Sequence, residues 1–92
     1  MAIEVQVGSA IRRRIGSTTK SIMAEGSDVR EVIDNVESQY PGFKGQIIND
    51  KGEIHQHIMI VLDDEDVRFK NGLDTKLEDG TTIAILPALI GG

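Results

Sequence analysis

The chain has 92 residues, a formal net charge of −5 and no cysteine. This length suits one small domain, and the lack of cysteine excludes a disulfide, a thiolate metal site and a thiol nucleophile. The negative charge and the low aromatic content disfavour a nucleic-acid partner, because phosphate binding needs a basic face and bases need stacking platforms. No stretch approaches the roughly 18 apolar residues of a membrane helix, and no signal-peptide pattern opens the chain. We therefore expect a cytoplasmic protein without a membrane partner.

The first quarter of the chain predicts two strands. Residues 3–7 alternate apolar and polar side chains, which indicates a half-buried strand. Residues 19–24 read as a second, shorter strand. The basic stretch 10–17 between them, with Arg12 to Arg14, is expected to be a long solvated loop. Such a triplet could also bind phosphate or an acidic partner surface.

The next segment predicts the main helix of the domain. Ser27 occupies the expected N-cap position, and Asp28 and Glu31 fall in the first turn, where acidic residues favour a helix. Pro41 and Gly42 then end the helix. One face is apolar at helical spacing, through Val29, Val32, Ile33 and Val36.

The second half of the chain predicts three more strands with short connections. Residues 43–48 form a connection with one turn of helix, and 57–62 form a strand built from a continuous run of strand-forming residues. A turn at 63–66 leads to a short returning strand at 67–69, and 81–86 form the last strand.

The element order β-β-α-β-β-β indicates an α+β domain. A mixed four- to five-stranded sheet, with one main helix packed across one face and the last strand returning to the centre, matches the β-grasp, or ubiquitin-like, fold. We expect residues 1–86 to form this domain and residues 87–92 to form an extended tail.

The tail ends in Gly91 and Gly92 after an apolar run. Glycine has no Cβ, so its carboxyl carbon is unhindered and the backbone can enter a channel as narrow as a peptide. Pro87 cannot donate to a sheet and is expected to end the strand and begin the tail. Residues 87–92 span up to about 20 Å if extended. We expect the Gly92 carboxylate to be the reactive group, which predicts a carrier and not an enzyme.

The last third of the chain carries a specific pattern: Asp64–Phe69, Gly72–Thr75, Leu77, Asp79-Gly80, Ile83, Ile85–Ala88 and Gly91-Gly92. This pattern resembles the MoaD/ThiS sulfur-carrier family, and within it the CysO-type branch, which supplies sulfur for cysteine synthesis.

The resemblance implies a chemistry for the C-terminus. An E1-like adenylating enzyme of the MoeB/ThiF type would use ATP to convert the Gly92 carboxylate to an acyl-adenylate, and a sulfur donor would then leave a thiocarboxylate. The carrier itself would bind no cofactor and no metal. The cysteine branch implies a PLP-dependent cysteine synthase as sulfur acceptor, together with a JAMM-type metalloprotease.

Three other functions remain open from the sequence. The chain could be the small subunit of molybdopterin synthase (MoaD), which inserts its tail into the large subunit. It could be a ubiquitin-like modifier that forms isopeptide bonds through Gly92, or an inert β-grasp binding module.

Partners are expected to contact the tail and the sheet face away from the helix. If Ile58, Ile60 and Leu62 point inward together with Ile83 and Ile85, the residues between them point outward. An apolar patch rimmed by charge marks an interaction site, although the tail or a second copy could also cover it. The predicted partner-binding residues are Met59, Val61, Ala84 and Leu86 on the sheet and Pro87, Ala88, Leu89 and Ile90 in the tail.

Two polar clusters are interpreted as structural. His55 and His57 would share one face of a strand, but no third ligand is near and catalytic zinc needs three. Asp63 to Asp66 lack the spacing and the terminal Glu of a calcium loop, so we expect a solvated turn.

Overall fold

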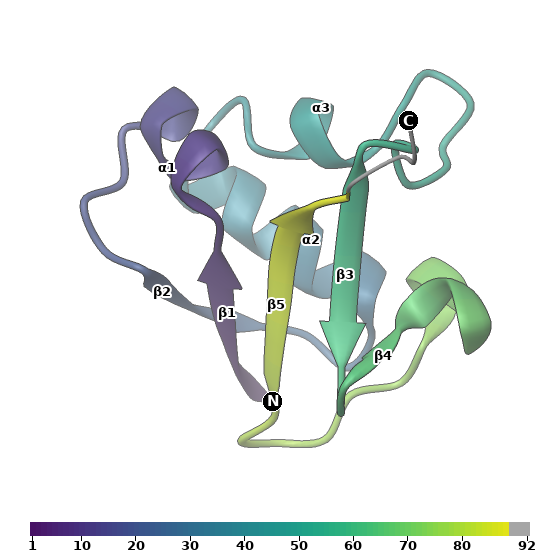
Figure 1. Cartoon of the computed structure of the whole chain (residues 1–92). Coiled ribbons are helices and arrows are strands. Elements are labelled where there is room, and N and C mark those ends of the chain that lie inside the picture. Colours follow the sequence, from purple (N-terminus) through teal and green to yellow (C-terminus); the bar gives the residue numbers. More distant parts are fainter. Residues whose placement is uncertain (89–92) are drawn as a thin grey trace.

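The computed structural model describes residues 1–88 and shows one mixed sheet with the longest helix across one face (Figure 1). This confirms the predicted α+β arrangement. In chain order the elements are β1 (Ala2–Val7), α1 (Ser9–Ile15), β2 (Ser21–Glu25), α2 (Val29–Gln39), α3 (Lys44–Ile47), β3 (Ile58–Leu62), β4 (Glu65–Asp66), the 3₁₀ turns η1 (Val67–Phe69) and η2 (Gly72–Asp74), and β5 (Thr82–Pro87).

The last strand lies in the middle of the sheet, as the sequence predicts. The strand order is β2-β1-β5-β3-β4, with β5 parallel to β1 and antiparallel to β3. Val5 pairs with Ile83 on one side of β5, and Ile60 pairs with Ile85 on the other. The C-terminal segment therefore leaves the sheet from its centre.

The core lies between the sheet and α2. Alternate residues of β1, β3 and β5 point toward the helix because side chains alternate across a strand. The apolar face of α2 covers them, and its four predicted residues are fully buried: Val29, Val32, Ile33 and Val36. Phe43 and Ile47 close one end of this core and are also fully buried.

The N-cap of α2 is one residue later than predicted. The Asp28 Oδ1 atom accepts from the Glu31 N–H at 2.8 Å, so Asp28 caps the helix and Ser27 does not. Ser27 lies just outside the helix and donates both its N–H and its hydroxyl to the Glu31 carboxylate, each at 2.8 Å. These bonds lower the pKa of Glu31 below its ordinary value.

The basic stretch predicted to be a loop is the helix α1. Ile11 is buried, and Ile15, four residues later, packs against the core, so the segment has a short apolar stripe at helical spacing. Gly16 ends the helix in the left-handed conformation, with φ of 76°. The three arginines lie in the last turn, where their positive charge interacts favourably with the negative end of the helix dipole.

The predicted strand at 67–69 is also wrong. Only Glu65 and Asp66 pair with β3, and Val67–Phe69 form a 3₁₀ turn. The Asp66 Oδ1 atom accepts from the Arg68 N–H at 2.9 Å, which caps the turn and ends the strand. Val67 is buried by this turn, although its neighbours suggest an extended chain.

A polar cluster lies at the start of β5, on the sheet face away from α2. The Glu4 carboxylate accepts from the Ser21 hydroxyl at 2.7 Å and from the Thr82 hydroxyl at 3.3 Å. The Ser21 bond is the main cause of a Glu4 pKa below its ordinary value, while partial desolvation opposes it. Glu4 therefore stays ionised on this face.

The turn between β3 and β4 gives a first testable prediction. Asp63 and Asp64 have φ of 53° and 65°, the left-handed values that a two-residue hairpin turn requires. Glycine adopts such values without a Cβ clash, so Asp64→Gly should raise the free energy of unfolding by about 0.5–1 kcal/mol. Urea unfolding measures this change, and Asp64→Ala is the control that should lower stability. A glycine variant less stable than the alanine variant would contradict the assignment.

The Glu4 cluster gives a second prediction. Ser21→Ala should raise the Glu4 pKa toward its ordinary value, as read from an NMR titration of the carboxyl carbon. Since the folded pKa is lowered, the cluster contributes stability above the unfolded pKa, and that stability is lost as the pH falls through the folded pKa. Ser38→Ala removes a hydroxyl that donates to the Asn35 carbonyl on α2 and serves as the control. An unchanged Glu4 titration in Ser21→Ala would show that the Ser21 bond does not set the pKa.

Candidate functional site

The tail begins at a hydrogen-bonded end of the central strand. β5 runs to Pro87, which pairs with Ile58, and the Ala88 N–H donates to the His57 carbonyl at 2.8 Å. Pro87 ends the strand, as predicted from its ring. The expected tail residues Leu89, Ile90, Gly91 and Gly92 lie outside the described part of the chain.

Pro87 has no N–H to donate, but its position in β5 does not require a hydrogen bond to β3. Hydrogen-bonded and non-hydrogen-bonded pairs alternate along an antiparallel ladder. Because Ala88 donates to His57, the adjacent pair of Pro87 and Ile58 occupies a non-hydrogen-bonded position. On the other side of β5, Gly8 donates its N–H to Ile85 at 2.9 Å, and a Cβ on Gly8 would lie 3.2 Å from the Pro87 ring. Gly8 thus leaves room for the proline.

The face of the sheet opposite α2 carries the four predicted outward residues. Met59 pairs with Leu86 and Val61 pairs with Ala84, so the four side chains share one face of β3 and β5. All four are partly exposed, which confirms the predicted register. The inward set is buried, as expected: Ile58, Ile60, Leu62, Ile83 and Ile85. We call the outward patch of Met59, Val61, Ala84 and Leu86 the open face.

The open face has polar edges. Gln6 is the neighbour of Ala84 on β1, and Glu4 is the neighbour of Thr82 at the end of β5 opposite the tail. Asp66 pairs with Val61 on the β4 side. The described part of the face is therefore an apolar strip that runs along β3 and β5 toward the tail, with acidic groups at its borders.

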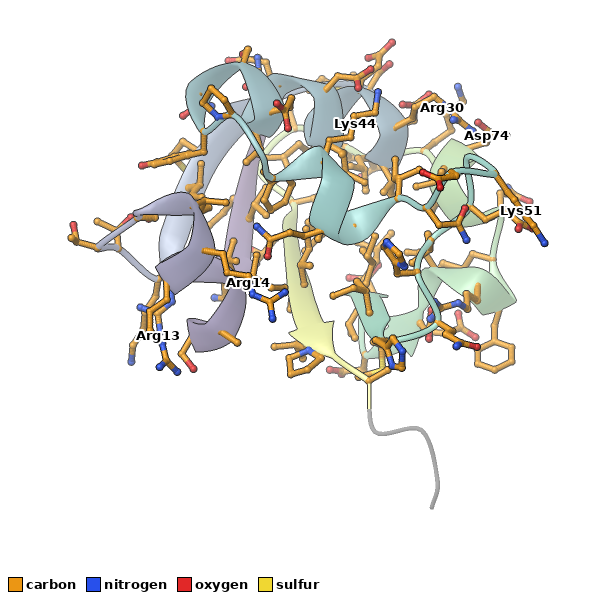
Figure 2. All side chains as sticks on the ribbon, turned by 90° about the horizontal axis from the view of Figure 1, so that it is seen from above. Arg13, Arg14, Arg30, Lys44, Lys51 and Asp74 are labelled. Atoms are coloured by element: carbon orange, nitrogen blue, oxygen red, sulfur yellow. The ribbon has the colours of Figure 1, made fainter. Side chains whose placement is uncertain are left out.

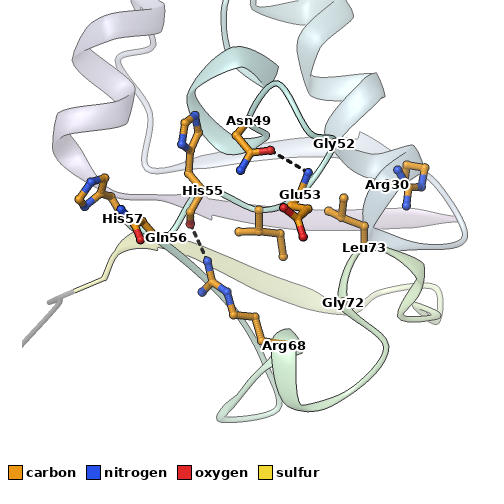
Figure 3. A pocket seen from close by; sticks show the side chains of 11 residues that line it. Arg30, Asn49, Gly52, Glu53, His55, Gln56, His57, Arg68, Gly72 and Leu73 are labelled. Carbon is orange, nitrogen blue, oxygen red and sulfur yellow. Dashed lines mark hydrogen bonds between the residues drawn. The ribbon is translucent and has the colours of Figure 1, made fainter.

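A pocket of about 830 Å³ lies beside the start of the tail (Figure 3). The segment between α3 and β3 forms one wall and contributes His55 and His57, while Arg68 follows β4 and Arg30 comes from α2. The sequence predicted that both histidines share one face of a strand. This is wrong, because β3 begins at Ile58 and both histidines lie in the turn before it. Within residues 1–88, no group of three His, Asp or Glu side chains could hold a metal ion.

Arg68 is a contact that the sequence reasoning missed. Its guanidinium donates to the His55 carbonyl (Figure 3). It also forms an ion pair with Asp66. Arg68 and His55 are 13 positions apart and belong to different elements. A hydrogen bond between them leaves no periodic signal in the sequence, so it was not predicted.

The labelled basic side chains of Figure 2 lie in separate regions of the molecule. Figure 2 shows Arg13 and Arg14 on α1, well apart from Arg30, Lys44 and Lys51. Arg30 pairs with Asp74 at 3.2 Å, and Lys44 pairs with Asp34 at 2.6 Å. In this view they do not form a continuous basic surface.

None of the helices in the described range 1–88 has the length and apolar character needed to cross a membrane.

Comparison with known proteins identifies the family. The family model of the ThiS family matches residues 5–92. The sulfur carrier protein CysO of Mycobacterium tuberculosis is 35% identical, with both chains covered completely, and its crystal structure superposes with a TM-score of 0.87 over 95% of this chain and 99% of that chain.

Two further proteins are similar over nearly the whole chain. A crystal structure of the BexX/CysO complex of Amycolatopsis orientalis contains a chain that is 39% identical, with a TM-score of 0.86 and coverage of 98% of this chain and 99% of that chain. The small archaeal modifier protein 3 of Haloferax volcanii is 28% identical over both full lengths.

These relatives are named carriers and modifiers, not enzymes. Their similarity confirms the β-grasp fold and the resemblance on which the sequence analysis relied. The match covers both the sheet that places the tail and the tail itself, and the chain therefore belongs to the ThiS family.

Proposed function

We propose that this protein is a sulfur carrier whose Gly92 carboxylate is adenylated by a partner enzyme and converted to a thiocarboxylate. The observation that carries the proposal is the family match through residue 92, which includes the terminal diglycine. The full-length similarity to CysO favours a role in cysteine synthesis. Small archaeal modifier protein 3 is less similar, so protein conjugation is the second candidate.

The proposed chemistry takes place at the last carbonyl carbon. A carboxylate resists nucleophilic attack, so the carboxylate oxygen first attacks the α-phosphate of ATP, which forms an acyl-adenylate and releases pyrophosphate. Hydrosulfide (HS⁻) from a sulfur donor then attacks the carbonyl carbon, the bond to AMP breaks, and a proton is released. The resulting thiocarboxylate is anionic at neutral pH and is itself a nucleophile, so the carrier needs no general base beside it.

The folded body holds the origin of the segment that carries this end group. Ala88 is held to His57 at the end of the central strand, and the four residues beyond it reach about 13 Å if extended. The carboxylate can then enter a partner's active site while the domain stays outside. ATP belongs to an E1-like adenylating enzyme of the MoeB/ThiF type and not to this chain.

The open face is the proposed docking surface. Its apolar strip leads toward Pro87 and Ala88, so a partner bound there would lie next to the origin of the tail. The chain of CysO in the Amycolatopsis orientalis structure is seen in a complex with BexX, which supports a carrier that binds a second protein. The proposed sulfur acceptor is a PLP-dependent cysteine synthase.

A substitution at the last residue tests the chemistry. Gly92→Ala adds a Cβ next to the attacked carbon and should reduce thiocarboxylate formation, in the presence of ATP, a sulfur donor and the adenylating enzyme, by about a hundredfold. The unfolding curve should not change. Gly45→Ala is a matched control because a Cβ there has no neighbour within 4 Å. Intact-mass measurement gives the yield. A fully converted Gly92→Ala chain would show that the missing Cβ of Gly92 does not matter, and a wild-type chain that is never converted would refute the proposal.

A second substitution tests the docking surface. Val61→Glu places a charge within the open face and should raise the KM of the adenylating enzyme for this protein by about tenfold, because a buried interface charge is costly. Met23→Glu makes the same change in charge on the same side of the sheet, at the outer strand β2, where Met23 is 59% exposed. Equal KM values for the two variants would place the docking surface elsewhere.

A further inference from the structure

A single turn supports the start of the tail. The Ile58 N–H donates to the His55 carbonyl at 3.0 Å, which closes the turn that leads into β3. His57 lies inside this turn, and its carbonyl accepts from Ala88 at 2.8 Å. The turn that begins at His55 therefore carries the acceptor that holds the last described residue of the chain.

Arg68 holds the corner of that turn from another element. Its Nη2 atom donates to the His55 carbonyl at 2.5 Å, so this oxygen accepts from both Ile58 and Arg68. At the same time its Nη1 atom lies 3.4 Å from Asp66 Oδ2, and its backbone N–H donates to Asp66 Oδ1 at 2.9 Å. Figure 3 shows the guanidinium reaching from η1 to the turn.

The other hydrogen bonds of this segment lie upstream of the turn or are made by the N–H of its first residue, His55. Asn49 Oδ1 accepts from the N–H groups of Lys51 and Glu53, at 2.9 and 3.1 Å. The His55 N–H donates to the Ile47 carbonyl at 2.8 Å. Among the side chains of residues 1–88, Arg68 is the one that donates a hydrogen bond to the His55 carbonyl, where the turn begins. A planar guanidinium suits this place because it can contact a carbonyl and a carboxylate at once.

We propose that Arg68 is a positioning residue for the C-terminal tail: by binding the His55 carbonyl it fixes the turn whose His57 carbonyl holds Ala88. This inference rests on the proposed function. Arg68 makes its polar contacts with His55 and Asp66, so it would act on the tail through the turn.

The expected effect is on capture of the tail. An enzyme bound to the open face must find a carboxylate at the end of a short segment, and the effective concentration of that group depends on how tightly the segment's origin is held. A loosened origin spreads the carboxylate over a larger volume. KM for the carrier should therefore rise while kcat stays the same, because the reacting bonds at Gly92 are unaltered once the tail is bound.

The test compares two arginines that line the same pocket. Arg68→Met removes the guanidinium but keeps an apolar stem. Arg30→Met makes the same change in charge at a residue that is paired with Asp74 and does not contact the turn. NMR hydrogen exchange of the Ala88 amide reports on the tail origin, thermal unfolding reports on the whole fold, and steady-state kinetics with the adenylating enzyme report on KM and kcat.

In Arg68→Met, Ala88 exchange and KM should each rise about tenfold, since a hydrogen bond from a charged donor is lost. The Tm should fall by several degrees, as expected for the loss of one hydrogen bond in a domain of this size, and kcat should stay close to that of the wild type. Arg68→Lys keeps one donor without the fork, so both effects should be smaller. Arg30→Met should match the wild type in every readout.

Other outcomes would contradict the role proposed for Arg68. Unchanged Ala88 exchange in Arg68→Met would overturn the proposal, and so would faster exchange without a rise in KM. An equal rise in KM in Arg30→Met would assign the effect to the charge of the pocket. If the wild-type chain is never adenylated, the proposed function fails, and Ala88 exchange alone then decides whether Arg68 holds the tail origin.

Discussion

The pairing of β5 between β1 and β3 is the constraint on which the rest of the molecule depends. A strand at the centre of a sheet is held on both sides, so its end has a fixed position and direction. Because β5 is also the last strand, that fixed end is where the C-terminal segment starts. A flexible tail on an edge strand would lack this support. Burial of Ile83 and Ile85 stabilises β5 in the sheet, and the end of β5 is therefore a defined origin for residues 89–92.

The details around that origin are consistent with this role. Pro87 lies where β3 needs no donor, and Gly8 leaves space for its ring. Ala88 continues the ladder by one hydrogen bond to His57. The open face runs along the same two strands and provides an apolar surface next to the tail. In the proposed function the partner supplies ATP and the catalytic groups, and this chain supplies a carboxylate on a segment whose origin is held by the sheet.

The sequence was most informative where a periodic pattern was long. The spacing of Val29, Val32, Ile33 and Val36 predicted α2. The outward side chains of β3 and β5 followed only on the condition that Ile58, Ile60 and Leu62 point inward, because β3 is a continuous apolar run without a pattern of its own. Short elements were missed. In α1 the signal was just Ile11, Ile15 and Gly16 beside three arginines that suggest a solvated loop. At 67–69 the residues favour a strand, but the Asp66 cap favours a 3₁₀ turn. The contact between Arg68 and His55 depends on tertiary packing and has no local signature.

The central claim is that the reactive group of this protein is its last carboxyl group and that the folded domain serves to present it. Intact-mass spectrometry of the chain purified from its own cells, grown with a high demand for sulfur, tests this claim most directly. The account predicts a fraction of the chain whose mass exceeds the unmodified mass by the difference between sulfur and oxygen, located at Gly92 by fragmentation. A chain joined to other proteins through Gly92 would keep the reactive carboxyl group but favour conjugation over sulfur transfer. A chain that is always unmodified at Gly92 under these conditions would contradict the account.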